Sequence, residues 1–187
     1  LFGLLALVPT TDLAVALVNL VVGERIGPQP LSKLELRDAV PPELRTLIVM
    51  PALLTGDAEV ERLIDQLEVH HLANPDAELR FALLSDWTDA DTETMPADDQ
   101  LVARAAAGIA RLNARYPAPA PAEKRFYLFH RARRWNAREA RWMGWERKRG
   151  KLHELNQLLR GATDTSFVPA GGPPLAPPSG VTYVITL

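Results

Sequence analysis

The sequence predicts an α/β fold in which a mostly parallel β-sheet carries helices on its faces. Short continuous apolar runs, typical of buried strands, alternate with longer segments whose apolar residues repeat on a helical period. The predicted order is strand, helix, strand, helix, strand, helix, strand. In such sheets ligands bind beyond the carboxyl ends of the strands, so the residues that follow each strand are the first candidates for a site.

The composition limits the class of protein. The chain has 187 residues, 47% of them hydrophobic and 24% charged, which suits one well-buried domain. It has no cysteine, which excludes a disulfide framework and thiolate chemistry, and its four histidines lack metal-ligand spacing. The chain starts at Leu1 and ends inside an apolar run at Leu187, and we interpret it as part of a longer protein.

The first 45 residues are predicted to lie outside the α/β fold. Residues 1–22 are mostly apolar, but a break at residues 9–12 leaves no run long enough to span a bilayer, and no signal peptide is recognisable. We expect a short helix over residues 13–22, either packed on the domain or adjacent to a membrane. Residues 23–45 contain four prolines and are predicted to be a linker.

Residues 46–187 are predicted to form the folded domain. Strands are expected at residues 46–50, where Pro51 ends the run, and at 79–85, 125–130 and 181–187. Helices are expected at residues 57–72, 97–116 and 146–160, and loops at 131–144 and 162–180. The last strand would be an unpaired edge, through which we expect copies of the chain to dimerise unless the segment is disordered.

Residues 125–161 form a strongly basic segment. They hold 11 of the chain's 21 Lys and Arg residues but three of its 23 Asp and Glu residues, so they carry about +8 in a chain of net charge −2. Three of the four tryptophans also lie there. Such segregated charge attracts anions locally. A position on the solvated surface explains the arginines from Arg131 to Arg141 equally well, and the sequence assigns them no role.

Two groups of polar residues are candidates for ligand binding. Asp86, Asp89 and Asp91 follow the second predicted strand, where a carboxylate can accept a hydrogen bond from a base N–H or a ribose hydroxyl. Residues 148–151, Lys-Arg-Gly-Lys, combine a glycine that permits close approach with cations that suit a diphosphate. The alternative for the aspartates is that they are solvated and cap the next helix, and the alternative for residues 148–151 is a solvated basic turn. The sequence contains no Rossmann fingerprint, P-loop or nucleophile elbow.

These segments, in this order, resemble the first half of a GT-A glycosyltransferase of the processive, membrane-linked kind. They are more similar still to the cyclic β-1,2-glucan synthases of glycosyltransferase family 84. The resemblance covers about residues 44–187 and rests on IVMPALLT, LEVHHLANPDAELRFALLSDW, the FHRARRWN run and WMGWERKRGKLHELNQLLRG. It implies an incomplete GT-A-like domain whose whole protein transfers glucose from UDP-glucose to a growing β-1,2-glucan, at the cytoplasmic face of the bacterial inner membrane.

The resemblance also implies roles for individual residues. The nucleotide contacts that it implies are Pro51, Ala52, Asp86, Gly150, Lys151 and Asn156. Asp86 would contact uracil, and Lys148 and Arg149 are candidates for the diphosphate. Family 2 relatives usually carry an Asn-Glu pair shortly after the first-strand proline, whereas residues 52–54 here are Ala-Leu-Leu, so that acidic contact is absent or supplied elsewhere.

The D-x-D motif that binds Mg²⁺ or Mn²⁺ in this family would follow the last strand, beyond Leu187. We therefore expect no metal ligand, catalytic residue or bound cofactor in this chain, and no activity from the chain alone. Two other functions stay open: a nucleic-acid-binding module that uses the basic, Trp-containing segment, and a non-catalytic assembly domain whose basic face meets anionic lipid. We favour the glucan synthase, which predicts no nucleic-acid partner.

Overall fold

The computed structural model describes residues 2–26, 39–120, 123–169 and 176–187. The chain divides into two compact units, Leu1–Arg37 and Asp38–Leu187, and each is described by itself. Part of the predicted linker, residues 27–38, and part of the predicted loop, residues 170–175, lie outside the described residues. The domain limits proposed from the sequence therefore stay predictions.

The first unit contains helix α1 (Phe2–Ile26), which is longer than the sequence predicted. The helix continues through Pro9, so the break expected at residues 9–12 is wrong. A proline removes one backbone hydrogen bond and can be accommodated by a kink, and Thr11 Oγ1 donates to the Val8 carbonyl at 2.7 Å beside it. Residues Leu7–Ile26 are 20 in number, with a mean hydropathy of 1.4, and are long and apolar enough to cross a membrane, contrary to expectation.

The second unit is built around a five-stranded sheet with the order β6-β3-β2-β1-β7. Its strands are β1 (Thr46–Leu54), β2 (Leu79–Trp87), β3 (Phe126–Arg131), β6 (Phe167–Val168) and β7 (Tyr183–Thr186). Strands β1, β2, β3 and β7 are parallel, which confirms the predicted fold class. Strand β6 lies in the loop predicted at residues 162–180 and pairs antiparallel with β3. Strand β7 lies at one edge of this sheet, and dimerisation through it stays a prediction.

Strand β1 continues through Pro51, where the sequence predicted its end. The Val49 carbonyl accepts a hydrogen bond from the Leu187 N–H at 3.0 Å, so the backbone of Val49 points towards β7, and by the two-residue period of a strand so does that of Pro51. The pairing of β1 with β7 ends at Val49, and Pro51 cannot donate the next hydrogen bond on that side, but the pairing of β1 with β2 on its other side continues. The strand can therefore extend to Leu54.

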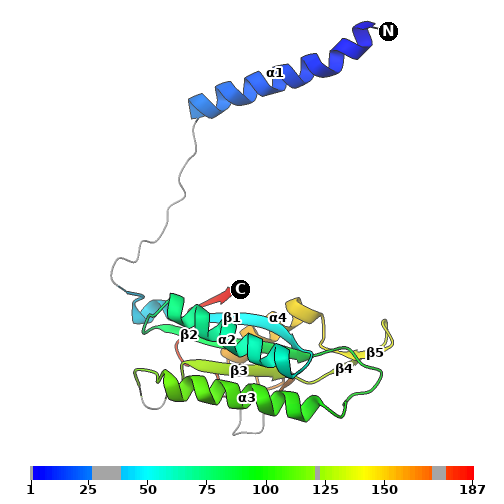
Figure 1. The fold of residues 1–187 in the computed structure, drawn as a ribbon. Coiled ribbons are helices and arrows are strands. Elements are labelled where there is room, and N and C mark those ends of the chain that lie inside the picture. Colours follow the sequence, from blue (N-terminus) through cyan, green and yellow to red (C-terminus); the bar gives the residue numbers. More distant parts are fainter. Residues whose placement is uncertain (1, 27–38, 121–122, 170–175) are drawn as a thin grey trace. The chain divides into compact units, whose positions relative to one another are not determined.

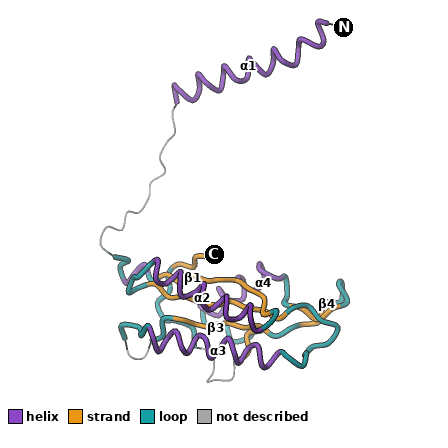
Figure 2. The backbone as a smooth tube through the Cα atoms, in the orientation of Figure 1, coloured by secondary structure: helices purple, strands orange, loops and turns teal. Residues whose placement is uncertain are grey.

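Helices cover both faces of the sheet (Figure 2). On one face α2 (Asp57–Ala73) and α3 (Asp98–Arg115) pack on alternate strand residues such as Ile48 and Phe81. On the other face Leu155 of α4 (Arg147–Leu159) packs on the intervening residues, such as Val49. This two-sided burial explains why the strand sequences are continuously apolar.

A two-stranded hairpin, β4 (Arg134–Asn136) and β5 (Arg141–Met143), lies where the sequence predicted a loop. Trp142 in the hairpin exchanges two backbone hydrogen bonds, each 2.9 Å, with Ala90 in the loop after β2. A short 3₁₀ helix, Pro42–Leu44, precedes β1. The hairpin and the loop after β2 are thus joined next to the carboxyl end of the sheet.

Candidate functional site

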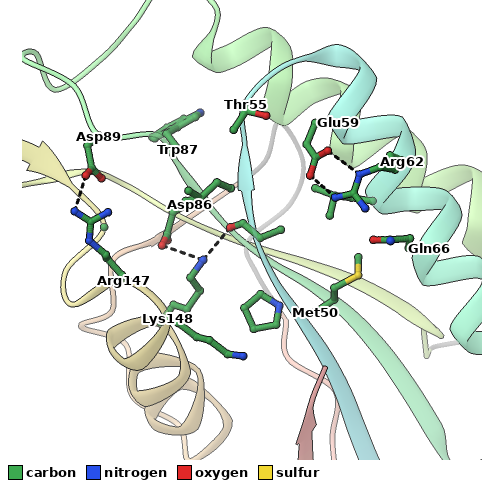
Figure 3. A pocket seen from close by; sticks show the side chains of 16 residues that line it. Met50, Thr55, Glu59, Arg62, Gln66, Asp86, Trp87, Asp89, Arg147 and Lys148 are labelled. Atoms are coloured by element: carbon green, nitrogen blue, oxygen red, sulfur yellow. Dashed lines mark hydrogen bonds and ion pairs between the residues drawn. The ribbon is translucent and has the colours of Figure 1, made fainter.

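A cavity of about 470 Å³ opens at the carboxyl ends of β1 and β2 (Figure 3). Its walls come from the end of β1, the first turns of α2, the end of β2 and the segment that leads into α4. Five of the residues predicted to bind a nucleotide or its diphosphate line it: Pro51, Ala52, Asp86, Lys148 and Lys151. They converge because parallel strands end at the same edge of a sheet, which is where α/β proteins bind ligands.

Asp86 is the centre of a buried ion cluster. Arg131 Nε donates to Asp86 Oδ1 at 2.8 Å and Arg131 Nη2 donates to Asp86 Oδ2 at 3.0 Å. The Lys151 Nζ atom lies 3.1 Å from Asp86 Oδ2, and none of the three side chains is more than 4% exposed. The strand register places Arg131 directly opposite Asp86, so the pairing follows from the sheet. Charges can be buried in this way because they are paired and hydrogen-bonded.

Lys151 joins the two strands whose ends form the cavity floor. Its Nζ donates a hydrogen bond to the carbonyl of Ala52 at 2.8 Å, in addition to its contact with Asp86. Burial lowers the pKa of the Lys151 ammonium, and the Asp86 carboxylate partly offsets this change. Lys151 is therefore already committed to protein partners.

The other cations of the cavity differ in what they contact. Arg147 forms ion pairs with Asp89 at 2.9 Å and with Glu139 at 3.3 Å, and Arg62 pairs with a glutamate one turn earlier on α2. Lys148 is exposed, and no carboxylate of the described residues lies within ion-pair distance of it. Lys148 is thus the cavity cation with its charge available to an incoming anion.

Three predicted contacts lie outside the cavity wall. Arg149 is 81% exposed and pairs with Glu146, and Asn156 is exposed on α4. Gly150 is buried, and a Cβ atom added to it would lie 1.9 Å from the Trp145 carbonyl oxygen. The close approach that this glycine permits is therefore to the protein's own backbone. The nucleotide roles implied for these residues stay predictions.

The arginines that the sequence left unassigned fall into two classes. Arg131 and Arg133 are buried, and Arg133 pairs with Asp98, donates to the Thr88 carbonyl at 2.7 Å and lies over the Trp87 ring at 5.1 Å. The remaining members, Arg134, Arg138 and Arg141, are exposed. The position of Arg131 at the end of a strand beside the Asp86 strand was a usable signal for its pairing. The partners of Arg133 lie at the end of β2, in the loop that follows it and at the start of α3, and no local pattern predicted that they meet.

Several residues of the cavity were not predicted from the sequence. They include Gly144 before α4, Arg147 at the start of α4, and Thr55, Glu59 and Arg62 near the start of α2. The α2 residues had a recognisable signal, because a helix that follows a parallel strand begins at the edge where the strand ends. In the ranges that the structure describes, no three His, Cys, Asp or Glu side chains are placed to hold a metal ion. The Mg²⁺ or Mn²⁺ site that the resemblance implies beyond Leu187 stays a prediction.

Behind the cavity, His130 is buried beside the end of β2. Its Nδ1 lies 2.8 Å from Ser85 Oγ, and its ring meets that of Trp87 edge-on at a centroid distance of 4.2 Å. Its Nε2 has no hydrogen-bond partner among the described residues. Burial lowers the pKa of His130 from its ordinary value of 6.5 to about 4, because a charged imidazolium would be poorly solvated there.

This histidine is expected to make stability depend on pH between about 6.5 and 4. In that range the unfolded chain takes up a proton that the folded chain excludes, so the free energy of unfolding falls as pH falls, by about 3 kcal/mol in total for this group. Urea denaturation at pH 4, 5, 6 and 7, for the wild type and His130→Gln, measures the effect. The variant should lose less stability across this range, and equal pH dependence of the two proteins would contradict the prediction.

Comparison with known proteins identifies a relative of this chain. The chain is 47% identical, over 184 residues, to the cyclic β-(1,2)-glucan synthase NdvB of Rhizobium meliloti (strain 1021). The match covers 98% of the chain but 6% of the length of that relative. No model of a known protein family matches the chain. The chain is therefore similar, over nearly all of its length, to one segment of a cyclic β-(1,2)-glucan synthase, which confirms the resemblance predicted from its sequence.

Proposed function

We propose that this chain is the nucleotide-sugar-binding segment of a glucan synthase that transfers glucose from UDP-glucose to a growing β-1,2-glucan. The observation that carries the proposal is the convergence of Pro51, Ala52, Asp86, Lys148 and Lys151 in one cavity at the carboxyl end of the sheet. These residues come from three separate parts of the chain, and the sequence alone marks each of them as a candidate. The similarity to a glucan synthase supports the class of enzyme.

Asp86 is proposed to bind the uracil ring. An ionised carboxylate offers about four hydrogen-bond acceptor positions. Arg131 and Lys151 make three contacts with it, two at Oδ2 and one at Oδ1, so Oδ1 retains a position for the imide N–H of uracil. Pro51 and Ala52 would then lie against the base, and Lys148 would meet the diphosphate.

Lys148→Ala is expected to weaken UDP binding about tenfold, because the variant loses a charge-assisted contact with the diphosphate. Calorimetric titration of the full chain with UDP measures the change. Lys124→Ala removes another exposed lysine, at the opposite end of β3, and should leave the affinity unchanged. Equal affinities of wild type and Lys148→Ala would contradict the role of Lys148. Release of glucose from UDP-glucose by the chain alone would contradict the proposal that the chain binds without transferring.

Helix α1 is proposed to hold the chain at the cytoplasmic face of the bacterial inner membrane. Twenty residues of helix at 1.5 Å per residue span about 30 Å, the thickness of the bilayer's hydrocarbon core. The apolar side chains of Leu13, Leu17 and Leu20 are exposed, and lipid would cover them. The chain should stay with membranes after alkaline extraction, and its residues 38–187 should be digested by protease added from the cytoplasmic side. Protection of those residues would contradict this location.

A further inference from the structure

We propose that Arg131 is the positioning residue of the cavity. Its side chain holds Asp86 and the turn before α4 (residues 145–146) in the arrangement that receives a nucleotide. The inference rests on the proposed function for the identity of the ligand. Arg131 does not line the cavity itself, and the sequence left it unassigned. Its side chain is fully buried at the end of β3, next to the end of β2.

All five N–H groups of the Arg131 guanidinium have acceptors. Nε and one Nη2 hydrogen bind the two oxygens of Asp86. The other Nη2 hydrogen is donated to the Arg147 carbonyl at 3.2 Å. The Nη1 hydrogens go to the Trp145 carbonyl at 3.1 Å and to Glu154 Oε1 at 3.4 Å. One side chain therefore joins β2, the turn before α4 and α4 itself.

The turn that Arg131 holds is strained. Glu146 and Arg147 have φ angles of 46° and 47°, in the left-handed region that residues other than glycine seldom occupy. Such a backbone persists when its surroundings determine it, and here the carbonyls on both sides of the strained pair accept hydrogen bonds from Arg131. The cavity wall contains Gly144, which precedes this turn, and Arg147 and Lys148, which follow it at the start of α4.

The cluster also extends away from the cavity. Glu154 Oε2 accepts a hydrogen bond from the Ser166 backbone N–H at 2.9 Å, so Glu154 is itself held in place on the far side from the ligand. A lysine at position 131 would keep the positive charge but would offer three donors from one point, in place of five in a planar fork. It could pair with Asp86 and would release the two carbonyls of the turn.

The test compares Arg131→Lys with Arg80→Lys in the full chain. Arg80 is a matched control, because it is also a buried arginine of this sheet, with a carboxylate (Glu123) and the Ala77 carbonyl as partners, but it lies at the other end of β2. Two quantities are measured under conditions where both variants remain folded: amide hydrogen exchange without ligand, and affinity for UDP. Hydrogen exchange reports the turn directly, and a general loss of stability affects both variants alike.

In Arg131→Lys, the amides of residues 145–148 should exchange at least about tenfold faster than in Arg80→Lys, and UDP affinity should fall at least about tenfold. Arg80→Lys should bind UDP like the wild type. Unchanged exchange of the turn in Arg131→Lys, or equal changes in both variants, would overturn the inference. If the wild type does not bind UDP, the proposed function fails, and the exchange measurement still decides whether Arg131 positions the turn.

Discussion

Asp86→Ala is expected to lower the free energy of unfolding by about 3–5 kcal/mol, which is the usual cost of removing one partner from a buried ion pair. The substitution would leave the Arg131 guanidinium and the Lys151 ammonium in the interior without their carboxylate. Neither cation can reach water easily, because Arg131 is 0% and Lys151 is 4% exposed. Urea denaturation at pH 7 measures the loss.

Asp91→Ala is the control for this experiment. The Asp91 side chain is 89% exposed and lies 3.9 Å from Arg141, so its removal should change stability by less than about 0.5 kcal/mol. If the Asp86→Ala protein does not fold, Asp86→Asn, which preserves the shape but not the charge, tests the same point. A loss of stability in the Asp86 variants no greater than in Asp91→Ala would show that the ion cluster does not stabilise the fold.

Gly150→Ala is expected to cost about 3 kcal/mol or more, at the upper end of what overpacking costs. The added Cβ would lie 1.9 Å from the Trp145 carbonyl oxygen, and a backbone atom cannot move away by changing rotamer. Relief requires α4 and the preceding turn to separate, which would also disturb the hydrogen bond from Arg131 to Trp145. Both the melting temperature and UDP affinity should fall.

Gly56→Ala is the matched control for the glycine. Nothing lies within 4 Å of a Cβ at that position, and the φ angle of 171° is extended backbone open to any residue. Its stability should therefore stay within about 1 kcal/mol of the wild type. If Gly150→Ala is as stable as Gly56→Ala, the turn before α4 can shift at little cost, and Arg131 does not hold it rigidly.

The order of strands and helices was predictable because it depends on local pattern. Buried strands such as β2 are continuously apolar, and α2 and α3 repeat apolar residues on a helical period, so each was located to within two residues of its ends. The errors came where the local pattern was overruled. Pro9 did not end α1, and Pro51 did not end β1, because each proline removes one backbone hydrogen bond while the rest of the helix, or the pairing of β1 with β2, continues past it.

The candidate site was predictable in part. Asp86 was found because it directly follows a strand, and Lys148 and Lys151 were found from their charge beside a glycine. No local pattern showed that Asp86 and Lys151 contact each other, or that Lys148 has no carboxylate partner among the residues that the structure describes. It also assigned Gly150 an approach to ligand, where the structure places the Trp145 carbonyl against it.

By itself the sequence determined the α/β class, the edge of the sheet at which the cavity opens and the similarity to a glucan synthase. These follow from the order and periodicity of residues along the chain. Only the tertiary structure decided which charges are buried together. Arg131 and Asp86 are 45 residues apart and meet through the register of two parallel strands, whereas Arg134, three residues further on, is exposed. The partner of a side chain depends on long-range packing, and the local pattern does not contain it.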